Sequence, residues 1–324
     1  MMRFTVVALP VLCMILFLSA VVRELDIAQQ HADSYENQCD YVSSRGIMRS
    51  CDTYPVNPTS STLYVNLRFH GSIIYVQGSA VRFFYYFVLP TMRSRFVLVT
   101  GDCDESVPTN VLSSGEFESF IVDERLIHWF SQNLVLRHPK MTIIPIGLDY
   151  HSMTHGAVTR WGAPIDPLSQ ELVLKTIARA APPLHERLVR CYASFHFNTR
   201  FARNKAIADL DRSIVYYEPL LVERADTWRA QSTMAFVISP WGNGYDCHRT
   251  WEALVLGCNP VVLSSPIDDV FAELPVLIVE DWRDLNASVL HATLDAFSRK
   301  AFNLERLKLS YWSNLIRETG SRTT

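Results

Sequence analysis
The sequence has no long run of lysine and arginine, and its 30 basic residues against 33 acidic ones give a formal net charge of -3 at pH 7. A nucleic-acid-binding protein gains most of its affinity by neutralising phosphates, so this balance argues against that class. The chain also has no internal repeat and no low-complexity block. No Cys-x-x-Cys pair occurs among its 7 cysteines, so a structural zinc site has little support and we expect no metal site.

What the sequence does have is enough apolar material for a large core. Its 324 residues suit one or two domains, and 48% of them are hydrophobic while 19% are charged. In the N-terminal half, the pattern predicts an amphipathic helix over residues 126–136. It predicts strands there over residues 63–69, 72–76, 95–100 and 141–148.

The C-terminal half alternates short β-rich runs with helical stretches. Strands are expected over residues 188–195, 213–218, 234–239, 260–264 and 275–280. Helices are expected between them, at residues 203–211, 223–231 and 267–274 and just after residue 246. This alternation predicts an α/β fold with parallel, doubly wound sheets. A last amphipathic helix over residues 302–316 is expected to pack back across the cleft between the two domains.

Residues 4–22 form an uncharged apolar run. At about 1.5 Å per residue such a helix spans roughly a hydrocarbon core, so the run predicts a single membrane crossing. Arg3 precedes the run, whereas Glu24 offsets Arg23 after it, so we expect a cytoplasmic N-terminus and a lumenal remainder. A cleaved signal peptide is the alternative, although its apolar region is usually shorter and the Ala-x-Ala cleavage pattern is poor here.

The composition divides the chain into four parts. We expect a cytoplasmic tip and membrane anchor over residues 1–23 and a polar stem over residues 24–60. An N-terminal domain is expected over residues 61–175 and a C-terminal domain over residues 176–324, with the crossing between them in the proline-rich stretch at residues 156–183.

Cysteine usage is compatible with a lumenal setting. Cys39 and Cys51 are the only local pair that we expect to form a disulfide, because spacing alone fixes no other pairing. Cys258 is expected to be a buried thiol, since it falls on the apolar face of a predicted helix.

Residues 236–262, FVISPWGNGYDCHRTWEALVLGCNPVV, are the most informative stretch. An apolar strand is stopped by Pro240 and by a turn containing Gly242 and Gly244, where a backbone can approach a ligand closely. Asp246 suits the N-cap of the helix that follows. The buried face of that helix is expected to hold the residues that recur at helical spacing, Trp251, Leu254, Val255 and Cys258.

Arg249 and Glu252 lie off that apolar face, in the first two turns of the predicted helix. Backbone N–H groups and the helix dipole favour an anion there, so Arg249 can meet a pyrophosphate and Glu252 a ribose hydroxyl. Because Glu252 is off the buried face, its replacement is expected to leave the fold intact. The alternative is that the two residues form an ion pair on a solvated face.

The stretch PWGNGYDCHRTWEALVLGCNPVVL resembles the donor-binding segment of exostosin-like glycosyltransferases, which follows the pattern P-x-G-x-x-x-x-x-R-x-x-E-A-x-x-x-G-x-x-P-V. The resemblance is clearest over residues 189–285 and weaker in the N-terminal half. It implies the two-Rossmann-domain (GT-B) fold, a type II membrane protein, and transfer of a sugar from a nucleotide diphosphate with inversion. The implied donor contacts are Arg249 and Glu252, then Gly242, Gly244 and Asp246, and then Asn243, Arg203 and Asn198.

If the donor lies on the C-terminal domain, the base that deprotonates the acceptor comes from the N-terminal domain. The candidates are Asp102, Asp104, His128 and His151. Asp102 and Asp104 also form an Asp-x-Asp after a strand, which in single-domain transferases holds a divalent ion against the diphosphate. A third possibility is that the two aspartates only cap the turn.

The sequence therefore predicts a Golgi or other secretory-pathway glycosyltransferase that is anchored through residues 4–22. Its partners would be a nucleotide diphosphate sugar and a glycan or glycoprotein acceptor, with no required cofactor and no nucleic acid. One rival is a metal-dependent transferase that uses Asp102 and Asp104. The other is a non-catalytic carbohydrate-binding or scaffold protein that has kept the fold.

Overall fold

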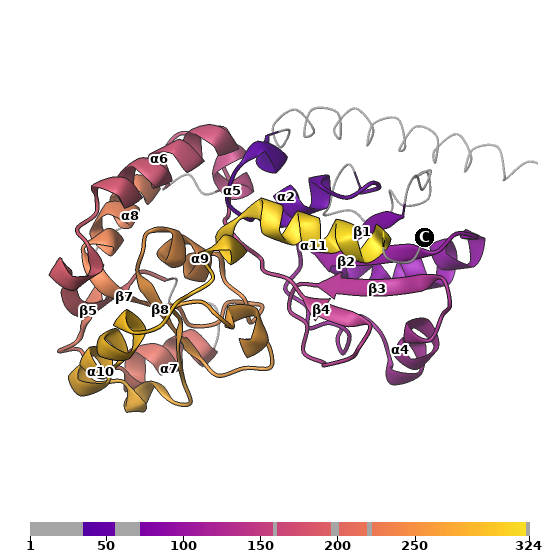
Figure 1. Cartoon of the computed structure of the whole chain (residues 1–324). Coiled ribbons are helices and arrows are strands. Elements are labelled where there is room, and N and C mark those ends of the chain that lie inside the picture. The colour runs from indigo at the N-terminus through magenta and orange to yellow at the C-terminus, as the bar shows by residue number, and fades with distance from the viewer. Residues whose placement is uncertain (1–34, 56–71, 158–160, 196–200, 219–221, 322–324) are drawn as a thin grey trace, which may run out of the picture.

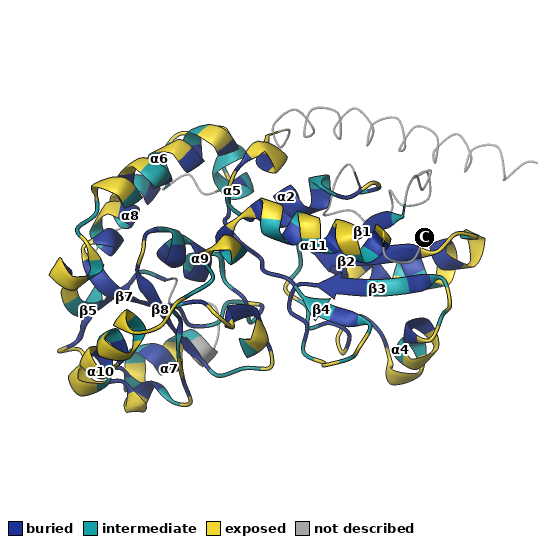
Figure 2. Ribbon diagram, viewed as in Figure 1, coloured by how far each residue is buried: buried dark blue, intermediate teal, exposed yellow. Residues whose placement is uncertain are grey.

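The computed structural model of the chain describes residues 35–55, 72–157, 161–195, 201–218 and 222–321. Within them the chain forms two α/β units that lie side by side, each built on its own parallel sheet (Figure 1). The predicted α/β class with parallel sheets is therefore confirmed. The central strands of both sheets are buried, whereas the outward faces of α6, α10 and α11 are exposed (Figure 2).

The N-terminal sheet has 4 strands in the order β1-β2-β3-β4, all parallel. Its strands are β1 (Ile73–Gln77), β2 (Phe96–Gly101), β3 (Leu126–Ser131) and β4 (Met141–Ile143). Every residue of β1 and β2 is buried, which explains why both read as continuous apolar runs in the sequence.

The C-terminal sheet has 5 strands in the order β6-β5-β7-β8-β9, again all parallel. Its strands are β5 (Leu188–Ala193), β6 (Val215–Tyr217), β7 (Met234–Ile238), β8 (Asn259–Leu263) and β9 (Leu277–Val279). All lie within the runs predicted from the sequence, apart from one residue at the start of β8. Counted from β5, this is the doubly wound order 2-1-3-4-5, whose direction of winding reverses between the first and third strands, here β5 and β7.

Helices cover both sheets and connect the strands. In the N-terminal unit they are α2 (Ser44–Arg49), α3 (Val81–Phe83), α4 (Ser114–Ile121) and α5 (His151–Thr154), with short turns η1 (Glu36–Gln38), η3 (Gly78–Ala80), η4 (Phe84–Val88) and η5 (Leu89–Thr91). In the C-terminal unit they are α6 (Pro167–Ala180), α7 (Phe201–Asp209), α8 (Arg224–Ser232), α9 (His248–Val255) and α10 (Ala287–Ser298), with η7 (Leu184–Glu186), η8 (Asp268–Phe271), η9 (Trp282–Asp284) and η10 (Leu304–Leu307). The last helix, α11 (Leu309–Ser321), lies on the N-terminal unit.

Two helices carry the chain between the units. Asp166 caps α6, whose Leu174 and Ile177 are buried in the core shared with α8 and α9. Residue 175, the predicted domain boundary, thus falls inside a helix. After the C-terminal unit, α11 returns to pack on α2 and the N-terminal sheet through Trp312 and Ile316, as the predicted return across the domains requires (Figure 1).

The predicted helix over residues 126–136 is wrong, because this segment forms strand β3. Trp129 and Phe130 point to opposite faces of the sheet and both are buried. A strand covered on both faces loses the alternation of apolar and polar residues that marks a half-buried strand. Its apolar positions then imitate helical spacing.

The segment around Cys39 and Cys51 also differs from the expectation. Instead of belonging to a polar stem, η1 and α2 pack in the core of the N-terminal unit, with Val42, Ile47 and Met48 buried. Cys39 and Cys51 are both free thiols, so the predicted disulfide is not formed. Each thiol instead donates a hydrogen bond to a carbonyl four residues earlier in its own turn.

The predicted membrane crossing over residues 4–22 lies outside the described residues, as does the expected strand over residues 63–69. Among the helices that are described, none is both long enough and apolar enough to cross a bilayer.

Candidate functional site
The segment singled out in the sequence lies where the winding of the C-terminal sheet reverses. Strand β7 ends at Ile238, a turn follows, and α9 begins at His248. In open parallel sheets, ligands bind beyond the carboxyl ends of the strands at such a point, because the two neighbouring connections leave on opposite faces. The carboxyl end of β5 lies beside this turn, since β5 pairs with β7.

Arg249 links the two strand ends. Its Nε donates a 2.9 Å hydrogen bond to the carbonyl oxygen of Ser194, directly after β5, and its guanidinium lies 5.6 Å from the ring of Phe195. Burial lowers the pKa of Arg249, although the group remains an arginine cation. Its Nη1 is buried and has no hydrogen-bond partner among the described residues. An unsatisfied, charged donor of this kind is suited to an anion that completes the site.

Glu252 lies one turn further along α9 and is held from the side. Arg224 and the indole Nε1 of Trp228 each donate a hydrogen bond to one of its carboxylate oxygens. The Arg224 side chain is 5% exposed and that of Glu252 12%, so this ion pair is largely buried. Arg224 is also stacked between Trp161 and Trp228, with its guanidinium carbon 4.3 Å and 5.0 Å from their ring centres. The alternative of an Arg249–Glu252 ion pair on a solvated face is therefore not observed, because Glu252 is paired with Arg224.

Asp246 does not cap α9, because Cys247 occupies the N-cap position. The carboxylate of Asp246 accepts hydrogen bonds from the backbone N–H groups of Cys247 (2.9 Å) and Ile146 (2.8 Å) and from Nε1 of Trp251 (2.9 Å). Its own N–H donates to Oδ1 of Asn133 at 3.0 Å. Burial raises the pKa of Asp246 to about 6, although these hydrogen bonds oppose the shift. Asp246 thus joins the segment between β7 and α9 to two loops of the N-terminal unit.

The glycines of the turn make room for other side chains. A Cβ on Gly244 would lie 2.7 Å from Nδ2 of Asn133, and a Cβ on Gly242 would lie 3.1 Å from Nη2 of Arg203. Arg203 also donates a 3.3 Å hydrogen bond to the carbonyl oxygen of Trp241, which places it beside the turn. Asn243 is exposed at the tip of the turn. Asn198 lies outside the described residues.

The predicted base candidates separate in the structure. His128 lies within β3, where burial lowers its pKa and its Nε2 is 2.8 Å from Oγ1 of Thr142. Asp104 is exposed after β2. Asp102 has a φ of 52°, and its carboxylate lies 3.7 Å from Nε of Arg45. No described carboxylate or histidine joins Asp102 and Asp104 in a group close enough to hold a metal ion.

His151 lies close to Asp149 and His248, two residues that were not predicted from the sequence. Its Nδ1 is 3.4 Å from Oδ1 of Asp149, and its ring centre is 5.9 Å from that of His248, the first residue of α9. Burial lowers the pKa of His151, against the effect of Asp149. Burial alone would raise the pKa of Asp149, but His151, His248 and Arg224 outweigh it and hold that pKa below its ordinary value. Asp149, His151 and His248, here called the interface trio, come from both units.

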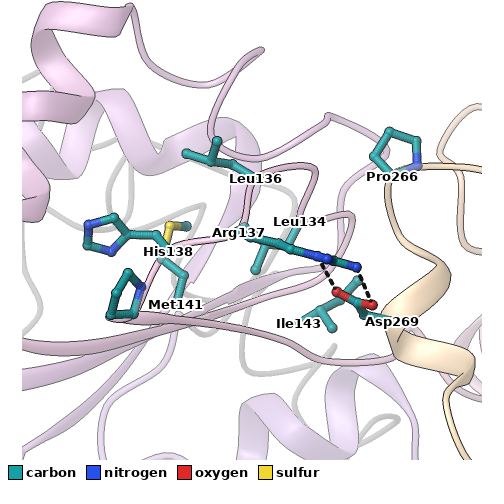
Figure 3. Close-up of a pocket in the computed structure, with 9 residues that line it drawn as sticks. Leu134, Leu136, Arg137, His138, Met141, Ile143, Pro266 and Asp269 are labelled. Carbon is teal, nitrogen blue, oxygen red and sulfur yellow. Dashed lines mark hydrogen bonds and ion pairs between the residues drawn. The ribbon is translucent and has the colours of Figure 1, made fainter.

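One pocket of about 310 Å³ opens between the units on another part of their border. It lies between the β3–β4 connection and η8, where Arg137 makes a two-pronged ion pair with Asp269 at 2.7 Å and 2.8 Å (Figure 3). Its remaining walls are mostly apolar side chains, Leu134, Leu136, His138, Pro139, Met141, Ile143 and Pro266. None of the residues predicted to bind the donor or to act as base lines this pocket.

No protein-family model matches the chain, and no curated protein sequence is similar to it. Several solved structures are distantly similar to it. One is described as trehalose-6-phosphate from E. coli bound with UDP-2-fluoro glucose; it is 10% identical, with a TM-score of 0.38 over 80% of this chain and 72% of that one. Another is Anabaena Alr3699/HepE in complex with UDP, at 12% identity, with a TM-score of 0.43 over 78% of this chain and 79% of that one.

A third is an alpha1,3-fucosyltransferase, 11% identical, with a TM-score of 0.40 and a coverage of 78% of both chains. All three TM-scores are below 0.5, so the likeness is distant. The function of this chain therefore has to be argued from its own residues.

Proposed function
We propose that the chain is a glycosyltransferase that transfers a sugar from a nucleotide diphosphate donor to an acceptor hydroxyl, with inversion. The observation that supports this most is Arg249, whose buried Nη1 has no hydrogen-bond partner within the described part of the chain. It lies in the first turn of α9, at the point where the winding of a parallel sheet reverses. A diphosphate would find a fixed cation there, together with the N–H groups of a helix N-terminus.

In the proposed reaction, the acceptor hydroxyl attacks C1 of the sugar and the nucleoside diphosphate leaves. Arg249 and the N-terminal N–H groups of α9 stabilise the negative charge that grows on the leaving group. Removing one such contact often costs roughly 3 kcal/mol, or about a hundredfold in rate. Glu252 remains the proposed partner of the ribose, because each carboxylate oxygen can accept a second hydrogen bond beside those from Arg224 and Trp228.

His151 is the proposed base. Its side chain is 20% exposed beside the first residue of α9, and the carboxylate of Asp149 lies behind its Nδ1. A carboxylate in that place stabilises the imidazolium that forms when the acceptor proton is taken. Asp102 is a weaker candidate, because Arg45 already offsets its charge. His128 is engaged with Thr142 inside the N-terminal sheet.

The acceptor, the cellular site and the lack of a required metal are parts of the same proposal. Residues 4–22 would anchor a type II protein in the Golgi or another secretory membrane, and the acceptor would be a glycan or glycoprotein. Activity is expected to survive EDTA, because Arg249 and a helix terminus meet the diphosphate charge. Full loss of activity that manganese restores would instead favour a metal held by Asp102 and Asp104.

A screen of nucleotide diphosphate sugars by thermal shift tests the proposal. A ligand present at about a hundred times its dissociation constant adds about 2.7 kcal/mol to the free energy of unfolding, so the true donor should raise the melting temperature clearly. The matching transfer assay should then release free nucleoside diphosphate. Binding of glycans with no response to any nucleotide sugar would support the non-catalytic, scaffold alternative.

A further inference from the structure
We infer that the interface trio, Asp149, His151 and His248, is a binding site for a divalent transition-metal ion of the zinc class. The three side chains each offer one ligand atom, and these atoms lie within 4.8 Å of one another. They reach the site from two directions, since Asp149 and His151 belong to the loop after β4 and to α5, whereas His248 begins α9. The site therefore exists only when the two units are in contact.

The contact between His151 and Asp149 has the spacing of two ligands of one ion. Oδ1 of Asp149 and Nδ1 of His151 are 3.4 Å apart, but they do not form a hydrogen bond, and Nδ1 has no hydrogen-bond partner among the described residues although it is buried. Ligand atoms at about 2.1 Å from a tetrahedral zinc ion lie about 3.4 Å from each other. A metal ion would satisfy the buried nitrogen that the protein leaves unsatisfied.

One ring nitrogen of His248 is held by a backbone carbonyl, which leaves the other nitrogen to bind a metal ion. Its Nδ1 lies 2.8 Å from the carbonyl oxygen of Gly147, an acceptor, so Nδ1 carries the proton and Nε2 keeps a lone pair. A backbone carbonyl that fixes the tautomer in this way is the usual companion of a metal-binding histidine. Asp149 is fixed as well, because its Oδ1 accepts a 2.9 Å hydrogen bond from the N–H of Ser152.

The positive charges near the interface trio are each offset by a carboxylate outside it, which favours binding of a cation. Arg45 is paired with Asp102, and Arg224 with Glu252, so each of the two nearby arginines has a carboxylate of its own. Two imidazole nitrogens and one carboxylate oxygen suit zinc, cobalt or nickel better than magnesium or calcium, which prefer oxygen ligands alone. Three protein ligands also leave one position open for water.

The effect of such an ion on transfer rests on the proposed function. If His151 is the base, an ion bound to Nδ1 leaves the proton of the neutral imidazole on Nε2, so Nε2 cannot take the acceptor proton and the ion inhibits. EDTA would then relieve this inhibition, whereas a transferase that requires its metal would lose activity.

The test uses Co²⁺ as an optical probe on the full chain freed of metal by EDTA and then of EDTA. One equivalent of Co²⁺ should bind and give visible absorption bands, and Zn²⁺ should displace it. His248→Ala and Asp149→Asn should each weaken binding at least about tenfold. His291→Ala is the matched control, because His291 is exposed on α10 of the same protein. Melting curves without metal check that the variants fold.

Binding that is absent, or equally strong in His248→Ala and His291→Ala, overturns the site. Once the donor is known, Zn²⁺ at one equivalent should suppress transfer reversibly, and stimulation by Zn²⁺ would overturn the inhibitory role. If no nucleotide sugar supports transfer, the proposed function fails. The Co²⁺ bands would still report on the metal site, so the two failures can be told apart.

Discussion
Glu252 is paired with Arg224 and is the proposed partner of the donor ribose. Glu252→Gln should raise the dissociation constant of the donor about tenfold, or roughly 1.4 kcal/mol, because a neutral amide replaces the charge-assisted bond to the ribose only in part. Glu252→Ala should weaken binding further. Calorimetric titration with the donor measures both, and unchanged affinity in Glu252→Ala would place the donor elsewhere.

The same residue also bears on stability. The position of Glu252 off the apolar face of the helix predicts, from the sequence, that its replacement leaves the free energy of unfolding unchanged. The ion pair with Arg224 predicts a loss of stability instead, since removing one partner of a buried pair costs about 3–5 kcal/mol. Thermal melting without donor should show the loss in Glu252→Ala, so the melting and titration data have to be read together.

His151→Ala tests the base by separating rate from binding. We expect the turnover number to fall at least about a hundredfold, because general base catalysis contributes typically 10²–10⁴-fold. The dissociation constant of the donor should stay within about twofold, since the donor is bound by the other unit. Full turnover in His151→Ala would contradict the assignment of His151 as the base and would favour Asp102, the other candidate at the interface.

Sequence reasoning found some of these residues and missed others for a physical reason. The position of Arg249 in the first turn of a helix after a glycine turn could be predicted, because local pattern alone marks such a helix start. Asp149 and His248 could not be paired in this way, since they are 99 residues apart and meet only where the two units touch. The predicted N-cap role of Asp246 is wrong, and one of the partners of its carboxylate, the N–H of Ile146, belongs to the other unit and cannot be found from local pattern.

At the level of elements, two of the contacts between the units should contribute very differently to the free energy of unfolding. Asp246→Ala would leave buried N–H donors of Ile146, Cys247 and Trp251 without an acceptor, at about 1–3 kcal/mol each, partly offset by no longer burying the carboxylate. We expect a net loss of at least about 2 kcal/mol in the free energy of unfolding.

Arg137→Ala is the matched comparison, because it breaks an ion pair between the same two units at an exposed place. The side chains of Arg137 and Asp269 are 85% and 51% exposed, and exposed pairs contribute roughly 0–1 kcal/mol. Unfolding of both variants by denaturant measures the two losses in the free energy of unfolding. Equal losses for Asp246→Ala and Arg137→Ala would contradict the importance given to the buried contact.

The strands of the C-terminal unit could be predicted because Gly, Pro and polar turns punctuate short β-rich runs there. Strand β3 could not, since Trp129 and Phe130 are buried on opposite faces and erase the alternating pattern. The segment of η1 and α2 was read as a stem because its few apolar residues show no period. Its core position depends on packing against α11, from the far end of the chain.

For the whole molecule, the apolar run over residues 4–22 is predicted to attach the protein to a membrane. A version of the chain that begins at Ser34 and carries a cleavable signal should be secreted and soluble, because it keeps η1 and everything after it while losing that run. Fractionation with a carbonate wash measures this. Persistent association with the membrane pellet would contradict the predicted topology.

The most direct measurement is the affinity of Arg249→Gln for the donor identified by the thermal-shift screen. The dissociation constant should rise at least about tenfold, roughly 1.4 kcal/mol, because the buried cation that meets the diphosphate is gone. Arg299→Gln, which alters an arginine that is 74% exposed at the C-cap of α10, is the control and should bind the donor as the unaltered protein does. If Arg249→Gln folds and binds the donor as tightly as Arg299→Gln, the start of α9 is not the diphosphate site.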